Sequence, residues 1–246
     1  MKHFQFRRIS REDSLINEVY KLRYKVYCDE WGFEHPEDHP RGIECDIYDE
    51  HSVHFGALEK ESGQLIGTIR CILYSDVGFP IEKHCVITRD LSYFDKSKFA
   101  EISRLAVSKE YRRRAVDRLI YGDGMYREEK VLLAKERREK EYLIVMGLYL
   151  TMYKECLALG LTHWYALMAE GLFALLRRME IHFEPIGPEI DHHGMRAPYF
   201  GSIGGIAERV SSGKAEILKK YENAMESRQG MPKFPIPVPS VLRLDG

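Results

Sequence analysis

The sequence has no long hydrophobic run and no secretory signal. None of its apolar stretches approaches the roughly 18 to 20 residues that a membrane-spanning helix requires. Residues 1–8 lack the apolar centre and the small-residue cleavage site of a signal peptide. We therefore expect a cytoplasmic protein without a transmembrane segment.

Paired cysteines and an excess of charge of one sign are also lacking. The five cysteines form an odd set without a C-x-x-C pair and without closely spaced Cys and His. This pattern argues against a disulfide framework and against a zinc site, so we expect no metal. A formal net charge of -1 gives no overall attraction to nucleic acid. No nucleic-acid partner is expected.

What the sequence does contain is typical of a globular enzyme. Of its 246 residues, 44% are hydrophobic, which is enough for a single core. Apolar periodicity predicts helices over 10–29, 143–159, 171–180 and 206–228, and strands over 52–59, 65–74, 99–107, 162–169, 181–183 and 197–203. The first two strands are joined by a short Gly-containing connection and should form an antiparallel hairpin. This order predicts an α+β fold with a mixed sheet.

We expect one domain over 1–228 and a proline-rich extended tail over 229–246. Residues 122–141 are dominated by Glu, Lys and Arg, which predicts a charged helical insertion rather than core. This segment is either a solvated face or a docking surface for an acidic carrier protein.

A first group of candidate residues follows the first helix. Arg23 and Tyr27 are four residues apart, so they share a helix face and can present a cation and an aromatic ring together. The aperiodic segment 31–49 is long enough for a functional loop, and we expect it to cover a pocket. Within it, Asp46 and Asp49 suit an ammonium group. The alternative is an ordinary salt bridge beside core aromatics.

A second group lies within apolar strands. Arg70 stands on one strand, and Glu101, Ser103 and Arg104 stand on the next. Ionisable groups are costly to bury unless they are paired, so these residues form either an ionic core or the lining of a pocket. We favour the pocket because such groups on neighbouring strands make an acid/base site.

A third group, Arg112, Arg113 and Arg114, precedes an expected helix. Backbone N–H groups at a helix start bind pyrophosphate or phosphopantetheine, and arginine supplies the opposite charge. His192 and His193 are adjacent and point in opposite directions, so they are not expected to share a metal. One of them, His193, could face the pocket and is a second candidate for the base.

Together these motifs resemble a known family. Leu22 to Tyr27 with Trp31, the pair Asp46 and Asp49, Arg70, and Glu101 to Arg104 resemble the acyl-homoserine lactone autoinducer synthases, a GNAT-fold family that uses acyl carrier protein thioesters. The segments 182–188 and 193–200 look like acyltransferases associated with exosortase systems, which are near the N-acyl amino acid synthases.

The resemblance implies an N-acyltransferase with the GNAT fold. It would move a long fatty acyl chain from the phosphopantetheine of acyl carrier protein to the amine of an amino acid or a similar small metabolite, with no permanently bound cofactor. Carried over by position, the catalytic residues are Arg70, Glu101, Ser103 and Arg104, and the substrate-binding residues are Arg23, Tyr27, Trp31, Asp46 and Asp49. Glu101 would deprotonate the amine.

Three points qualify the choice of reaction. The arginines at 112–114 replace the usual GNAT glycine loop and suit a carrier-protein donor better than coenzyme A. The alternatives are an acyl-CoA-dependent acetyltransferase and a catalytically idle binding module, and the intact set of Arg70, Glu101 and Arg104 argues against the second. A regular pleat would send Arg104 away from Glu101, so the site requires a bulge near Ser103, as in GNAT folds.

Overall fold

A computed structural model describes residues 3–112 and 127–211, and its centre is a mixed eight-stranded sheet. The strands are β1 (Phe4–Ile9), β2 (Ser52–Glu59), β3 (Leu65–Leu73), β4 (Phe99–Val107), β5 (His163–Met168), β6 (Glu184–Pro185), β7 (Ile190–Asp191) and β8 (Met195–Ser202). Their order is β1-β2-β3-β4-β5-β8-β6, and β7 pairs with β8. Only β4 and β5 pair in parallel among these described strands. The predicted α+β fold with a mixed sheet is confirmed.

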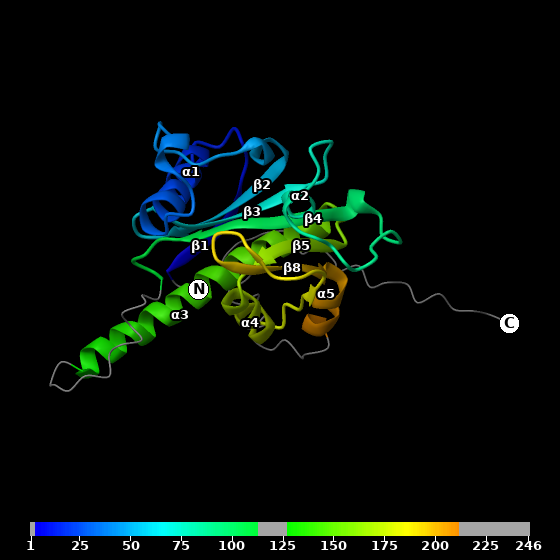
Figure 1. Cartoon of the computed structure of the whole chain (residues 1–246). Coiled ribbons are helices and arrows are strands. Elements are labelled where there is room, and N and C mark those ends of the chain that lie inside the picture. Colours follow the sequence, from blue (N-terminus) through cyan, green and yellow to red (C-terminus); the bar gives the residue numbers. More distant parts are fainter. Residues whose placement is uncertain (1–2, 113–126, 212–246) are drawn as a thin grey trace.

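Helices cover both faces of the sheet (Figure 1). One face carries α1 (Ile16–Tyr24), its π-helical continuation η1 (Lys25–Glu30), the short turns η2 (Pro36–Asp38) and η3 (Ile47–His51), and α2 (Pro80–His84). The other carries α3 (Arg127–Ala158), α4 (Glu170–Arg178) and α5 (Ile203–Ser211), while η4 (Lys96–Lys98) leads into β4. The main core lies between α3 and the sheet, and two smaller cores lie under α1 and α2.

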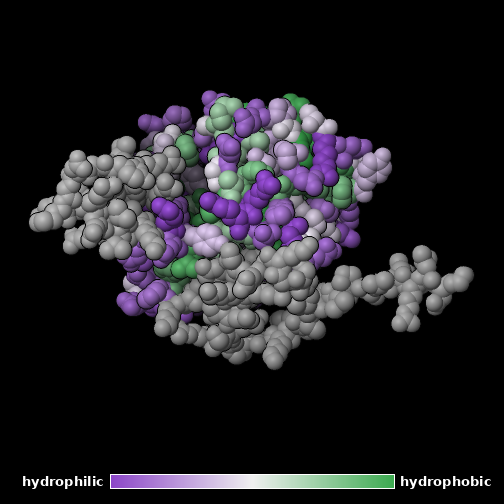
Figure 2. Space-filling view, turned by 90° about the horizontal axis from the view of Figure 1, so that it is seen from below, coloured by the Kyte–Doolittle hydropathy of each residue, from purple (hydrophilic) through white to green (hydrophobic). Residues whose placement is uncertain are grey.

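Close packing of α3 on the sheet depends on small residues. A Cβ at Gly147 would lie 2.3 Å from Cζ of Phe6. One added at Gly67 would lie 2.8 Å from a methyl group of Ile144. Glycine at both positions lets the helix backbone approach the strands at the density of a protein interior. Seen from below, the described surface is mainly hydrophilic, with smaller hydrophobic patches between the polar residues (Figure 2).

The predicted strands 52–59 and 99–107 are confirmed with the same bounds, and those at 65–74 and 162–169 differ by one residue at their ends. The strand β1 was not predicted, because only a short apolar alternation precedes its two arginines. The strand expected at 181–183 is wrong. Ile181 N–H instead bonds to the Leu176 carbonyl and closes the end of α4, and Glu180 has a positive φ of 61°.

Two helix predictions need correction. The first helix begins at Ile16 rather than Ser10, because Asp13 accepts bonds from Arg7 and from the backbone N–H of Leu15, and so holds the preceding residues in a turn. The charged stretch from residue 127 and the apolar stretch predicted from 143 form one continuous helix, α3. The predicted charged stretch is thus helical from residue 127, its first residues, 122–126, lie outside the described residues, and its origin as an insertion stays a prediction.

The last predicted helix is found as α5, which begins at Ile203. Its expected continuation to 228 and the proline-rich tail 229–246 lie outside the described residues. None of the helices within 3–112 and 127–211 combines the length and the apolar character that crossing a membrane requires.

Candidate active site

The strand β4 contains a bulge at the position that the site requires. Ser103 lies opposite Arg70 and Ala106 lies opposite Thr68, so Arg104 and Leu105 share the single partner position between them. Arg104 has a φ of 52°, a left-handed conformation that is unfavourable by roughly 1–2 kcal/mol for residues other than glycine. Such strain clusters at functional sites.

The bulge changes which side chains face which side of the sheet. Before it, Ala100 and Ile102 pack into the core under α3. After it, Leu105 and Val107 do so, while Ala106 joins the core under α1. The alternation of the strand therefore shifts by one residue. Arg104 consequently lies on the same face as Glu101 and Ser103, as the prediction required.

The parallel strands β4 and β5 separate at the same level. Their pairing runs from Phe99 and His163 to Ile102 and Ala166, although both strands continue further. Strands that stop pairing leave backbone N–H and C=O groups without ladder partners. Beside this separation the Tyr27 hydroxyl donates a hydrogen bond of 2.9 Å to the carbonyl of Leu105, inside the bulge.

A cavity of about 270 Å³ opens onto the bulge and gathers many of the predicted residues. The predicted residues that line it are Tyr27, Asp46, Arg70, Glu101, Ser103, Arg104 and His193. They come from η1, η3, β3, β4 and the turn between β7 and β8, which are widely separated in the sequence. All four residues predicted for catalysis thus meet at one cavity.

Arg23 and Asp49 do not line this cavity but form the ionic layer behind it. The Arg23 side chain is 0% exposed, and its guanidinium donates to Glu44 at 2.5 Å and to Asp49 at 2.6 and 3.1 Å. Burial opposes ionisation of Asp49, but Arg23 and Arg70 outweigh it and lower its pKa. The geometry fits a role for Arg23 in fixing the loop through Glu44, and it does not fit the predicted contact of Arg23 with a substrate.

Asp46 connects two of the arginines that line the cavity. Its carboxylate accepts a bond of 2.6 Å from Arg70 and one of 3.4 Å from Arg104. Its position is set by η3, in which Asp46 and Asp49 form a capping box with each other's backbone N–H groups. Arg70 also donates to Ser103 Oγ at 2.9 Å. Hydrogen bonds to one another therefore hold the side chains of Asp46, Arg70 and Ser103 in place before any ligand binds.

Glu101 is the buried acid of the cavity, with only 3% of its surface exposed. Burial raises its pKa to about 8, and this outweighs the opposing effects of the Ile81 N–H, which donates to Glu101 at 3.0 Å, and of Arg70. In its ionised form a carboxylate of this pKa is a stronger base than an ordinary glutamate and can accept a proton from an amine, and the ionised fraction grows as the pH approaches 8.

Histidines also line the cavity, and His192 and His193 both reach it, although adjacent residues were expected to point in opposite directions. The His192 ring lies 5.0 Å from that of His84 and 4.5 Å from that of His193. Burial, together with the neighbouring His193, lowers the pKa of His192 to about 4. Burial also lowers the pKa of His193. Both histidines of the pair therefore favour the neutral form of the ring at pH 7. Among the described residues no group of His, Cys, Asp or Glu is arranged to hold a metal ion.

Comparison with known proteins agrees with this geometry. The model of the acetyltransferase (GNAT) domain matches residues 22–122. The structure of TofI in a ternary complex with an inhibitor and MTA is similar, with a TM-score of 0.57 and 15% identity over 83% of this chain and 96% of TofI. The chain has the GNAT fold. Because the matched domain model describes acetyltransferases, the predicted enzyme class, an acyltransferase, is confirmed as well.

Two further structures with this fold are similar over most of the chain. The CoA-dependent acyl-homoserine lactone synthase BjaI, with SAM and isopentyl-CoA, has a TM-score of 0.56 and 16% identity over 89% of this chain and 90% of BjaI. FeeM, an N-acyl amino acid synthase from uncultured soil microbes, has a TM-score of 0.50 and 11% identity over 82% of this chain and 92% of FeeM. No curated protein matches the sequence.

Besides Arg23 and Asp49, two further predicted residues lie outside the cavity. Trp31 is 52% exposed and stacks on Phe33, whose ring is 5.6 Å away and lines the cavity. The Arg112 guanidinium lies 4.6 Å from the Trp31 ring centre and pairs with Glu30 at 2.7 Å. Arg112 is therefore already engaged, and its predicted partners Arg113 and Arg114 lie outside the described residues.

Some residues of the site were not predicted, namely Glu34, which lines the cavity, Glu44, which is buried behind it, and Arg196. Glu34 and Glu44 accept bonds from Arg104 at 3.0 and 3.1 Å. The acidic composition of the loop offered a signal for both, because arginines buried in strands require carboxylates. Arg196 at the start of β8 also lines the cavity, and nothing in its sequence context indicated this.

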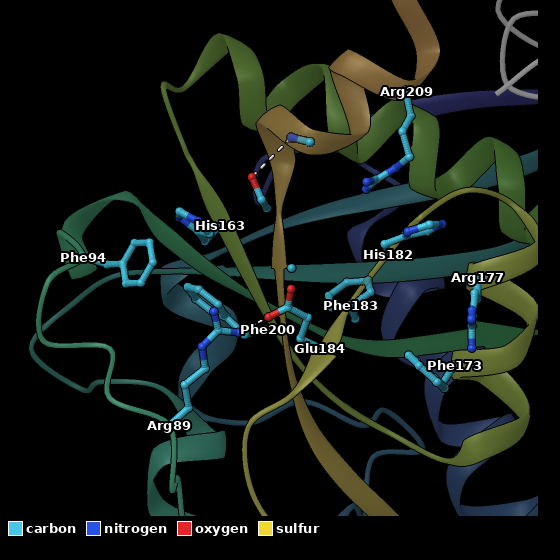
Figure 3. A pocket seen from close by; sticks show the side chains of 13 residues that line it. Arg89, Phe94, His163, Phe173, Arg177, His182, Phe183, Glu184, Phe200 and Arg209 are labelled. Carbon is cyan, nitrogen blue, oxygen red and sulfur yellow. Dashed lines mark hydrogen bonds and ion pairs between the residues drawn. The ribbon is translucent and has the colours of Figure 1, made fainter. Parts of the chain in front are cut away.

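A second cavity, of about 410 Å³, lies at the other end of β5 and contains none of the predicted residues. Figure 3 shows Phe94, His163 and Phe200 on one side and Phe173, Arg177 and His182 on the other. Its one lining carboxylate, Glu184, is exposed and pairs with Arg89.

Proposed function

We propose that the protein is an N-acyltransferase that moves a long fatty acyl chain from an acyl carrier protein thioester to the amine of an amino acid or a similar small metabolite. The observation that carries the proposal is Glu101, a buried carboxylate with a pKa of about 8 in a cavity beside the separation of β4 and β5. The likeness to acyl-homoserine lactone and N-acyl amino acid synthases supports it.

The geometry supports the following reaction. An ammonium group cannot attack a carbonyl, so the acceptor first transfers a proton to Glu101, directly or through one water. The amine nitrogen then bonds to the thioester carbon, and backbone N–H groups at the bulge are placed to stabilise the resulting oxyanion. When the C–S bond breaks, the sulfur leaves as a thiolate and takes up the second proton that the attacking nitrogen must lose, which gives a neutral amide and a free thiol. Asp46 and Glu34 add negative charge that attracts the cationic acceptor.

The donor has two candidates. The charged segment that includes residues 112–114 favours an acidic carrier protein, although the Arg112 side chain is paired with Glu30. The second candidate, an acyl-CoA donor, is favoured by the likeness to the CoA-dependent BjaI. We also propose a cytoplasmic location and kinship with the exosortase-associated acyltransferases, on the sequence motifs alone.

The test supplies the purified protein with acyl carrier protein and CoA thioesters of the same acyl chains, together with a mixture of amines, and identifies products by mass spectrometry. We expect an N-acyl product, formed faster from the carrier protein. Glu101→Gln is the matched control because it keeps the shape of the side chain and removes its basicity. Absence of an N-acyl product with both donors from folded protein would contradict the proposal.

A further inference from the structure

Three arginines line the active-site cavity, and they differ in how their charge is compensated. Arg70 pairs with Asp46 at 2.6 Å, and Arg104 pairs with Glu34 and Glu44 at 3.0 and 3.1 Å. Arg196 has no carboxylate partner among the described residues. The one hydrogen bond that its side chain makes to the described residues is weak, from Nη2 to the His193 carbonyl at 3.4 Å.

The Arg196 guanidinium is nevertheless largely withdrawn from water. Its Nε is buried without a hydrogen-bond partner, and its charge lies 5.4 Å from the ring centre of Phe33. Burial lowers the pKa of Arg196. Because this effect is not outweighed by neighbouring groups, the surrounding protein does not compensate the positive charge of the guanidinium. A buried donor without a partner is unfavourable by roughly 1–3 kcal/mol, which a ligand with an acceptor oxygen would recover.

Local structure holds Arg196 in this position. It pairs with Ile190 across the β7–β8 hairpin, whose turn contains His193 and Gly194 with φ values of 56° and 88°. The N–H of Gly194 bonds to the Asp191 side chain at 3.2 Å. The hairpin is therefore closed on its own, and the guanidinium is positioned without a ligand.

We infer that Arg196 binds the carboxylate of the acceptor, so that the acceptor is a free amino acid rather than a simple amine. This inference rests on the proposed function. A planar guanidinium matches a carboxylate in two parallel hydrogen bonds. With that carboxylate at Arg196, the amine of the same molecule can face Glu101 and the acidic residues across the cavity. Arg196 is then the residue that determines acceptor specificity.

The other anion in the reaction is the phosphate of the donor. It is separated from the reactive sulfur by the whole pantetheine arm. A cavity of about 270 Å³ that receives the thioester at the bulge cannot also hold that phosphate at Arg196. The acceptor carboxylate is thus the anion that fits.

The experiment compares amino acids with derivatives that lack the charge. The twenty standard amino acids are offered with an acyl thioester, and each one that is acylated is compared with its methyl ester and its decarboxylated amine. We expect wild-type kcat/KM to favour the free acid by roughly 10- to 100-fold. Arg196→Gln should raise the acceptor KM by a similar factor, leave the donor KM unchanged and abolish the preference. Arg196→Lys should restore part of it.

The control is Arg178→Gln, an exposed arginine on α4 that lines neither cavity, and it should behave as wild type. Equal rates with acid and ester in the wild type would overturn the inference and leave the proposed function standing. So would an Arg196→Gln variant with an altered donor KM, since that would place the donor phosphate at Arg196.

Failure of the proposed function is recognised separately. If the wild type acylates no amine, calorimetric titration of the same amino acids and their esters into wild type and Arg196→Gln still tests the inference. Binding that requires both the carboxylate and Arg196 supports it. Binding that ignores the carboxylate, or no binding to folded wild type, overturns it.

Discussion

The cavity at the β4 bulge and the cavity beside α4 and α5 differ in charge compensation more than in size. The larger one carries exposed or half-buried arginines and histidines over aromatic rings, and the one carboxylate that its described residues contribute, Glu184, pairs with Arg89 (Figure 3). The smaller one concentrates carboxylates around buried arginines and contains Glu101, an acid with a raised pKa. Perturbed, mutually paired groups thus identify the candidate active site better than volume does.

The largest expected effect is on stability, from Arg23→Ala. This change removes the buried partner that Glu44 and Asp49 share and leaves each with one other arginine, Arg104 and Arg70 respectively. Removing one member of a buried ion pair is destabilising by roughly 3–5 kcal/mol. Denaturation in urea measures the loss. The control is Lys21→Ala on the same helix, whose exposed pair with Glu18 is worth less than about 1 kcal/mol. Equal losses for the two variants would mean that the ionic layer does not hold the site.

The next effect is on catalysis, from Glu101→Gln. We expect kcat to fall by roughly 100-fold or more while thioester binding is retained, because the variant cannot accept the proton of the amine. Steady-state kinetics and donor binding are measured on the same preparation. Turnover near the wild-type value at every pH tested would remove Glu101 from the mechanism and make His193 the next candidate.

The pH profile gives a smaller and more specific effect. Glu101 is protonated below its pKa of about 8 and cannot then act as a base. Wild-type kcat/KM should therefore rise by about tenfold per pH unit as pH approaches 8, and level off above it. The acceptor amine also titrates, so the diagnostic result is the difference between wild type and Glu101→Gln. If kcat/KM rises with pH in the same way for the wild type and for Glu101→Gln, the rise is caused by titration of the acceptor amine alone.

The smallest effect is expected at the second cavity. Arg177→Ala changes an exposed side chain that no described carboxylate holds, so stability should change by less than about 0.5 kcal/mol and acyl transfer should not change. Thermal unfolding and the transfer assay check both statements. A marked loss of transfer would erase the contrast between the two cavities and show that the larger one takes part in the reaction.

The sequence predicted the elements whose apolar pattern is strong. The strands at 52–59 and 99–107 are long runs bounded by turns, so their bounds were found. The strand β1 was missed because Arg7 and Arg8 interrupt a six-residue alternation, and its pairing with β2 depends on residues about fifty positions away. Local pattern carries no information on such a distant partner.

The candidate site was predicted in part for a similar reason. Unusual residues within apolar strands, Arg70 and Glu101 above all, indicated a pocket from their own surroundings. Asp46 lines the cavity and Arg23 lies behind it, and this difference depends on three-dimensional packing. Arg196 reaches the cavity only because a hairpin at the edge of the sheet folds back beside the bulge. A one-dimensional pattern records none of this.

The bulge in β4 makes the length of this strand matter as much as its composition. Two sets of side chains, Glu101 with Ser103 before it and Ala106 after it, reach the same face only because one extra residue separates them. A substitution at Leu105 keeps that count, whereas a deletion there returns the strand to a period of two. Side chains on one side of the deletion must then point to the wrong face of the sheet, which disrupts either the cavity or the core under α3. Insertions and deletions are therefore excluded from these few positions, even where changes of residue type are tolerated.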